Sequence, residues 1–492
     1  MAPTPPKKSS AGKIIAIIGG LLVVAIIALI AVVVIARGSD TKADDVTVRT
    51  NEDTDGRAPQ PEPDKSMKED APDATGAVDI VGPTSGVENQ IASAAIVDIE
   101  AYWAEEFPVL TGADYEPVSG GFFSWSPDEE LPPCAESSDG IAGNAFYCGD
   151  GDVVAWDDTG LIPDLYQKYG DLSVATVFAH EWGHAIQARI GAQGSTVTLE
   201  QQADCFAGSW VKNVQENGSD YFVVDGPALD QALAGFIEIA DAPGTSALDE
   251  NAHGSAFDRI NSFQEGLTDG ADACLNYSDE TVGPRLVQLE FETQEDLDSG
   301  GNAAYADILE WTTLDLEDYW SIVADQVYGT TWTPLSAAVP FDGTEDDTPE
   351  CGGSDTSGYT LFYCVDGAFV AYDDIGLFPE VYDALGDFAV AALYGSQYSL
   401  AAQDQLGIAP KDARDQNLMA DCMTGSWAAS VFLQNRPDTG SLSLSPGDFD
   451  EAVKVLLALG STEDDGGTQG TGFERVSAFR TGVLNGVSAC EQ

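Results

Sequence analysis

The chain has 492 residues and carries 83 acidic against 20 basic side chains, which gives a formal net charge of −63 at neutral pH. A surface this negative repels nucleic acid and anionic lipid, so nucleic-acid binding is excluded as a function. The same charge keeps a secreted or exported domain soluble, and by itself it indicates no substrate.

The first predicted element is a membrane-spanning helix over residues 14–36, a run without any charged side chain. At about 1.5 Å per residue, such a helix spans the ~30 Å core of a bilayer. Lysines precede the run and Arg37 follows it, so the positive-inside rule places residues 1–13 in the cytoplasm. A cleaved signal peptide is the alternative, although its apolar core usually has only ~7–15 residues. We therefore expect a single-pass protein of the cell membrane whose C-terminal domains are extracytoplasmic.

The rest of the chain is predicted to form a linker and two folded units. Residues 37–88 are rich in Asp, Glu, Pro, Thr and Gly, which predicts a disordered acidic linker. Two units follow, at residues 89–280 and 306–492, with a second linker over residues 281–305. Each unit is long enough to bury a core of its own.

The two units are predicted to be homologous, because short strings recur in the same order. DIEAYW at 98–103 returns as DLEDYW at 315–320, and ADC at 203–205 returns as ADC at 420–422. The eight cysteines fall four to each unit, and an even number outside a membrane predicts disulfides. Their corresponding positions predict the pairs Cys134–Cys148, Cys205–Cys274, Cys351–Cys364 and Cys422–Cys490.

A metal-binding pattern lies in the first unit, where His180, Glu181 and His184 form H-E-x-x-H. The spacing of apolar residues predicts a helix over residues 172–190 around it, and a strand is predicted before it at residues 152–156. Positions i and i+4 of a helix share one face, so both imidazoles can bind one zinc ion. Glu181, beside them, is predicted to be the general base.

A catalytic zinc site needs a third protein ligand and keeps a fourth position for water. Gln187 and Ile190 stand where the third histidine of a metzincin would be, so that class is excluded. Glu200, which begins an E-x-x-x-D string, is the predicted third ligand. The alternative is a glutamate of a first helical turn, favoured there by the helix dipole. Asp204, one turn later, would accept the free N–H of a zinc histidine or serve the fold alone.

The second unit lacks the metal-binding residues. The positions of His180, Glu181, His184 and Glu200 hold Ser396, Gln397, Leu400 and Asn417, in that order. Serine and leucine cannot replace imidazole on zinc and glutamine cannot act as a base, so this unit is predicted to be inactive. His253, which faces Gln469, would stabilise the oxyanion of a tetrahedral intermediate or be merely structural. Arg259 returns as Arg475, which favours a structural ion pair.

The motifs together resemble the family of bacterial neutral zinc metallopeptidases. The resemblance rests on FYC at 146–148, AHEWGH at 179–184, EQQADCFAG at 200–208 and HGS at 253–255. It covers residues 95–276 and, in degenerate form, the second unit. It implies a gluzincin-like fold, Zn²⁺ as the cofactor and the hydrolysis of peptide bonds in peptide or protein substrates.

The expected fold class is α+β: an N-terminal transmembrane helix, an acidic linker and two homologous, disulfide-bonded, zincin-like, mainly helical units. The expected function is that of a membrane-anchored extracytoplasmic zinc metallopeptidase whose first unit alone is active. Two alternatives stay open at this point: an inactive cell-surface binding or scaffold protein, and a zinc-dependent amidase that acts on the cell wall. The second unit could bind substrate, cover the cleft or mediate dimerisation.

Overall fold

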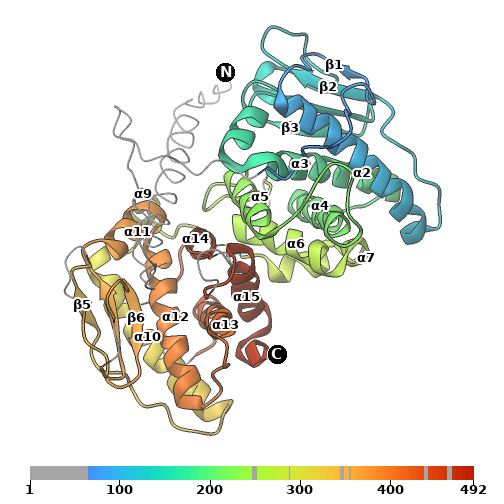
Figure 1. Cartoon of the computed structure of the whole chain (residues 1–492). Helices are drawn as coiled ribbons and strands as arrows, with labels where there is room; N and C mark the ends of the chain where they lie inside the picture. The colour runs from blue at the N-terminus through green and yellow to red at the C-terminus, as the bar shows by residue number, and fades with distance from the viewer. Residues whose placement is uncertain are drawn as a thin grey trace, which may run out of the picture.

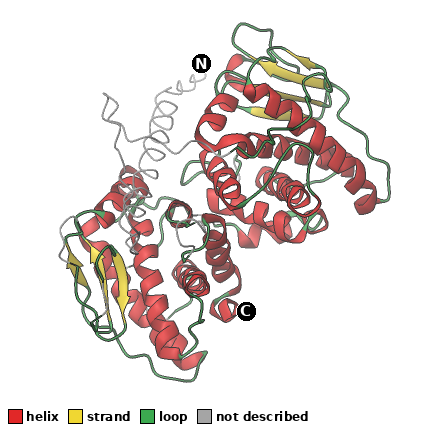
Figure 2. Ribbon diagram, viewed as in Figure 1, coloured by secondary structure: helices red, strands yellow, loops and turns green. Residues whose placement is uncertain are grey.

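The computed structural model describes residues 65–246, 252–287, 289–343, 348–353, 356–436, 442–461 and 468–491. Helices dominate both halves of the chain, and each half carries one small sheet (Figure 1). The two sheets lie at opposite ends of the molecule, and helices of both halves meet between them (Figure 2). We call the halves the first unit and the second unit.

The first unit begins with strands and one long helix and ends with a group of helices. Its elements are β1 (Ile80–Val81), α2 (Val87–Thr111), β2 (Gly121–Trp125), η1 (Ser138–Gly140), β3 (Ala145–Cys148), β4 (Val153–Asp157), α3 (Leu161–Ile190), α4 (Thr196–Asn217), α5 (Gly226–Glu238), α6 (Ala256–Asp269), α7 (Ala271–Cys274), α8 (Asp279–Val282) and η2 (Gly283–Arg285). The strand order is β1-β2-β4-β3, so β3 is an edge strand.

The second unit repeats most of this order of elements. Its elements are α9 (Gln294–Ser299), α10 (Tyr305–Gln326), β5 (Val339–Phe341), β6 (Leu361–Cys364), β7 (Phe369–Asp373), α11 (Leu377–Leu385), α12 (Asp387–Leu406), α13 (Ala413–Phe432), α14 (Asp448–Ala458), α15 (Gly472–Asn485) and η4 (Val487–Glu491). Its strand order is β5-β7-β6, with β5 parallel and β6 antiparallel to β7. In the first unit, β2 is likewise parallel and β3 antiparallel to β4.

The predicted acidic linker, residues 37–88, is structured from residue 65 onward. The backbone N–H of Met67 donates to Asp171 at 2.8 Å, and Met67 forms a β-bridge with Phe222. Further along, β1 pairs in parallel with β2. This stretch therefore belongs to the first unit, because its backbone groups find partners there.

The fold class expected from the sequence needs a correction in its membrane part. Within the described ranges, the chain has no helix that is long and apolar enough to cross a bilayer. The predicted transmembrane helix over residues 14–36 lies outside the described residues. The long helices α3 and α12 are buried in protein instead, and their polar side chains pair with neighbouring helices.

Two glycines let α4 and α6 cross at very short range. A Cβ atom added to Gly208 would lie 2.0 Å from the carbonyl oxygen of Phe263, and one added to Gly266 would lie 1.8 Å from that of Cys205. The same close crossing joins α13 and α15 in the second unit, at Gly425 and Gly482. Any larger side chain at these positions would push the two helices apart.

The four predicted disulfides are confirmed, and no described cysteine is free. The pairs are Cys134–Cys148, Cys205–Cys274, Cys351–Cys364 and Cys422–Cys490. In each unit, the shorter loop ends in a strand of the small sheet. The longer loop joins α4 to α7 in the first unit and α13 to η4 in the second.

The two units contact each other in a reciprocal way. Asp230 on α5 accepts the backbone N–H groups of Gly472 and Phe473, at the start of α15, at 2.9 and 2.6 Å. Asp450 on α14 accepts the N–H of Phe257, at the start of α6, at 2.9 Å. Each unit thus supplies an aspartate that caps a helix of the other, which the helix dipole favours.

Candidate functional site

The three residues of H-E-x-x-H lie in the buried second part of α3. This helix is kinked at Gly170, whose φ is 75°, and it ends at Gly191, a left-handed C-cap with φ 68°. The predicted end at Gly191 is therefore confirmed. His180 and Glu181 are each only 5% exposed, so the helix holds both side chains inside the protein rather than on its surface.

Glu200 reaches the site from α4, which packs across α3. The helix α4 starts at Thr196 after Ser195 as N-cap and has no acidic residue in its first turn, so the capping explanation of Glu200 does not apply. Close packing brings the helices together at Gly183: a Cβ there would lie 2.6 Å from the Cα of Ala203. The glycine within the motif therefore lets α4 approach α3.

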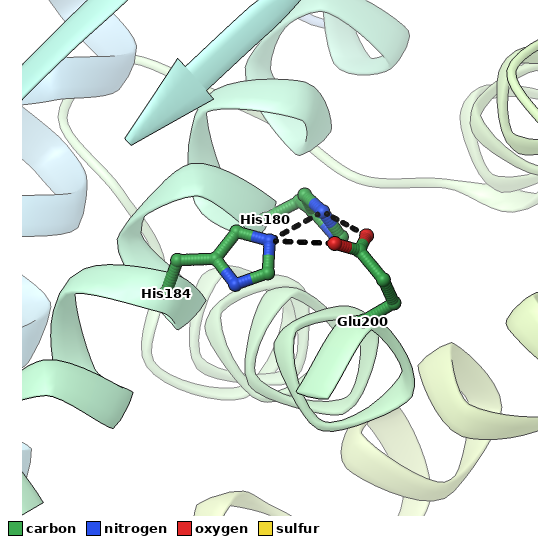
Figure 3. A group of neighbouring side chains, drawn as sticks. All are labelled: His180, His184 and Glu200. Atoms are coloured by element: carbon green, nitrogen blue, oxygen red, sulfur yellow. Dashed lines mark hydrogen bonds and ion pairs between the residues drawn. The ribbon is translucent and has the colours of Figure 1, made fainter. Parts of the chain in front are cut away.

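His180, His184 and Glu200 converge with their potential metal-binding atoms facing one another (Figure 3). The two Nε2 atoms are 3.2 Å apart. Glu200 Oε2 lies 3.2 Å from Nε2 of His180, and Oε1 lies 3.4 Å from Nε2 of His184. A tetrahedral zinc ion with ligands at ~2.0–2.1 Å holds its ligand atoms about 3.3 Å apart. The distances between facing atoms are thus close to the edge length of a zinc tetrahedron, with a different oxygen of Glu200 facing each ring.

Hydrogen bonds on the far side of each ring define which nitrogen is free. His180 Nδ1 lies 2.7 Å from Asp204 Oδ1, and His184 Nδ1 lies 2.9 Å from Gln187 Oε1. Gln187 is oriented by its own amide, which donates to the carbonyl of Leu199 at 2.5 Å. In its neutral form, each ring therefore carries its proton on Nδ1 and presents an Nε2 lone pair to the site. A lone pair that faces a carboxylate needs a cation between the two, either a metal ion or a proton.

Asp204 joins the site to a buried arginine. Arg259 donates to both of its carboxylate oxygens, at 2.8 and 2.9 Å, and to the carbonyl of Ile239. Asp204 and Arg259 are 0% and 1% exposed, so this pair is held away from water. Asp204 therefore has both of its predicted roles: it stabilises the fold through Arg259, and it orients the ring of His180.

The protonation of the site follows from these contacts. Burial disfavours the charged ring of His180, but Asp204 and Glu200 outweigh it and raise its pKa to about 10. Burial alone would raise the pKa of Glu200, whereas the two rings lower it well below its ordinary value. The metal-free site thus retains a proton at neutral pH, and a metal ion has to displace it.

Glu181 is held by the edge strand of the sheet. Its Oε2 accepts the backbone N–H of Tyr147 on β3 at 2.7 Å. The free edge of β3, opposite its partner β4, therefore faces α3. Glu181 does not belong to the set of three residues that could bind one ion, so its carboxylate remains next to the site rather than in it.

His253 lies apart from this group. Its backbone N–H and its ring both contact Asp241, the ring at 3.5 Å, and its side chain is 47% exposed. Among the described residues, no hydrogen bond or ion pair joins it to the two metal-site histidines or to Glu200. Its predicted role at the oxyanion stays a prediction.

Three features of the site escaped the sequence-based reasoning. Gln187 orients His184, Gly183 allows the approach of α4, and the N–H of Tyr147 positions Glu181. The first two left a signal, since Gln187 lies one helical turn after His184 and Gly183 lies inside the motif. The contact of the Tyr147 N–H with Glu181 uses a backbone group, so the residue type at this position could not predict it.

Comparison with known proteins agrees with this geometry. A family model described as "Putative neutral zinc metallopeptidase" matches residues 7–277, more than half of the chain. The uncharacterized protein YpfJ of Escherichia coli is 30% identical over 157 residues, which cover 27% of this chain and 53% of that protein. The uncharacterized protein Rv2575 of Mycobacterium tuberculosis is 28% identical over 167 residues, which cover 28% of this chain and 56% of that protein.

The chain thus spans about half the length of these curated relatives. No solved structure matches it. The matched family segment contains the H-E-x-x-H helix, Glu200 and the Asp204–Arg259 pair. On this match, the chain belongs to that family of neutral zinc metallopeptidases.

Proposed function

We propose that the first unit is a zinc-dependent peptidase that hydrolyses peptide bonds in peptide or protein substrates. One observation carries this proposal: Nε2 of His180 and Nε2 of His184 are 3.2 Å apart, and the Glu200 carboxylate faces both, with Oε2 at 3.2 Å from the first and Oε1 at 3.4 Å from the second. Two neutral imidazoles and one carboxylate leave a bound Zn²⁺ with about one net positive charge. Zinc held in this way supplies an acidified water and a polarised substrate carbonyl.

Glu181 acts as the general base in this proposal. It sits on α3 between the two histidines, and the N–H of Tyr147 fixes one of its oxygens. The other oxygen is left to take a proton from the attacking water and to return it to the leaving amine. Asp204 and Gln187 keep both rings in the Nδ1–H form throughout.

The edge strand β3 suits an extended peptide substrate. A peptide that pairs with an unpaired strand edge gains backbone hydrogen bonds whatever its sequence. The free edge of β3 faces the helix that carries the metal ligands, because its Tyr147 N–H reaches Glu181. A substrate laid along β3 therefore passes beside the general base, which favours a peptide over a compact substrate.

The second unit has no catalytic role in this proposal. Ser396, Leu400 and Asn417 stand at the positions of the metal ligands, and Gln397 stands at that of the base. The protein works outside the cytoplasm, since four disulfides without a free described cysteine are typical of oxidising compartments.

Metal analysis together with a peptide-cleavage assay tests the proposal. We expect one zinc per wild-type chain, none in His184→Ala, and cleavage of unfolded casein that is lost in the variant and on chelation. Zinc-free wild-type protein, or zinc-loaded protein without any turnover, would favour a binding or scaffold role. Cleavage of peptidoglycan fragments but not of casein would identify a cell-wall amidase instead.

A further inference from the structure

A second group of carboxylates lies in the second unit and shares no residue with the group of His180, His184 and Glu200. Asp387 is the first residue of α12, and Asp448 and Glu451 lie in the first turn of α14. One oxygen from each can be chosen so that all three lie within 4.8 Å of one another. The side chains belong to residues that are only 7%, 3% and 8% exposed.

Each carboxylate is anchored through one of its oxygens. Asp387 Oδ2 accepts the backbone N–H of Ala303 at 2.9 Å, Asp448 Oδ2 that of Ser445 at 2.8 Å, and Glu451 Oε2 that of Phe388 at 2.8 Å. The second oxygen of Asp387, Oδ1, is buried and accepts no hydrogen bond from the described residues. The three carboxylates are thus held in place by backbone hydrogen bonds, and one of their buried oxygens has no hydrogen bond. Hard cations bind to oxygen ligands arranged in this way.

No basic side chain neutralises this group. In the described part of the chain, no lysine, arginine or histidine forms an ion pair with any of the three carboxylates. Lys454, on the next turn of α14, lies near enough to act on Glu451 only at longer range, and Asp296 adds further negative charge. Buried charges without a partner are strongly unfavourable, so the group must bind a cation or retain protons.

The first unit lacks this group of carboxylates at the corresponding positions. Asp171 corresponds to Asp387, and its Oδ2 accepts the N–H of Met67 just as Asp387 accepts that of Ala303. The string LDQA at 229–232 corresponds to FDEA at 449–452, which puts Gln231 at the position of Glu451. Ala228 likewise stands where Asp448 does. The fold alone therefore needs only one of the three carboxylates.

Space for the third carboxylate is provided by a glycine. A Cβ atom on Gly386, whose φ is 114°, would lie 2.1 Å from Glu451 Oε1.

We propose that Asp387, Asp448 and Glu451 bind one calcium ion, which ties the start of α12 to the start of α14. Calcium takes six to eight oxygen ligands in flexible geometry, whereas Mg²⁺ keeps most of its waters and suits a buried site less well. This site is independent of the zinc centre in the first unit.

The test uses the whole purified chain, stripped of metals, reloaded with one equivalent of zinc and kept in excess Mg²⁺ and 150 mM NaCl (about physiological ionic strength). We expect one calcium to bind with a Kd below ~1 mM, as in extracellular modules, and to raise the melting temperature. Asp448→Asn and Glu451→Gln keep the shape of the side chains and remove one charge each. We expect each variant to lose at least about tenfold in affinity and most of the thermal response.

Asp171→Asn is the matched control, because it changes the corresponding aspartate of the first unit and should leave calcium binding as it is. An equal calcium response in wild type and in both variants would assign the binding to the acidic surface and overturn the proposal. A wild type that does not respond to calcium would overturn it as well, and the cluster would then be held together by protons. Far-UV circular dichroism and zinc content verify that each variant is folded.

Discussion

The two units share a buried aspartate–arginine pair, but only the first unit adds a histidine to it. Arg259 donates to both oxygens of Asp204, and Arg475 donates to both oxygens of Asp421 in the same way. In the first unit, Asp204 also bonds His180 at 2.7 Å. The ion pair is therefore part of the fold, and the proposed metal site uses an aspartate that this pair already holds in place.

At the other site positions, the second unit turns its polar groups toward its own backbone. Ser396 Oγ donates to the carbonyl of Leu393 at 2.7 Å, and the amide of Asn417 donates to that of Thr468 at 2.7 Å. Ser396, Gln397, Leu400 and Asn417 belong to none of the groups of described residues that could hold a metal ion. The proposed metal site therefore depends on the two imidazoles, which the same helix arrangement lacks in the second unit.

The strongest test of this contrast is Glu181→Gln, which gives the first unit the residue that the second has at Gln397. Glutamine keeps the size of the side chain but cannot accept a proton. We expect peptide cleavage to fall on the order of 10²–10⁴-fold while the zinc content stays at one per chain. Steady-state kinetics and metal analysis measure the two effects, and a variant with full activity would remove Glu181 from the mechanism.

The shared ion pair is tested by the matched variants Arg259→Met and Arg475→Met. Each removes the arginine that pairs with a buried aspartate, so each should lower the free energy of unfolding by about 3–5 kcal/mol. Urea denaturation measures that loss. Only Arg259→Met should also weaken zinc binding, by about 10–100-fold, because Asp204 then orients His180 less firmly.

Equal zinc affinity in wild type and in Arg259→Met would show that the arginine serves the fold alone. A loss of zinc in Arg475→Met would show that the second unit acts on the site from a distance.

Gly183→Ala tests whether the close approach of α3 and α4 belongs to the metal site. The added Cβ meets the Cα of Ala203 at 2.6 Å, so we expect a loss of about 1–3 kcal/mol in stability and weaker zinc binding. Ser399, the corresponding residue of the second unit, already has a side chain, which contacts Thr424. Ser399→Ala is the control and should leave zinc binding unchanged; zinc competition titrations compare the two.

The last prediction concerns how zinc affinity and the stability of the metal-free protein depend on pH. Asp204 and Glu200 raise the pKa of His180 from 6.5 to about 10, so zinc has to displace a proton below that pH. We expect zinc affinity to rise with pH by up to about tenfold per unit for each proton released. Without metal, the charged ring stabilises the fold below pH 6.5, and this contribution is lost as the pH rises toward 10. Melting curves with and without zinc would therefore diverge with rising pH; parallel curves would contradict the assignment.

Local patterns in the sequence determined much of this picture. The helix around His180 and its end at Gly191 followed from the spacing of apolar residues and from one glycine. The disulfide pairs followed from the recurrence of cysteines in both halves. The choice of Glu200 followed from a short acidic string. Each of these inferences depends on residues that are close in sequence or on the repeated order of the chain.

Only the tertiary structure decided how distant groups meet. The backbone N–H of Tyr147 on Glu181 and the spacing of Glu200 from both rings depend on how a sheet edge and two helices pack. The ring of His253 was expected to reach the site because of its position near Arg259 in the sequence, but it lies next to Asp241. The three carboxylates of the second unit come from two helices whose first turns are brought together by the fold. Sequence determines which chemical groups are present, but long-range packing determines which of them share one point in space.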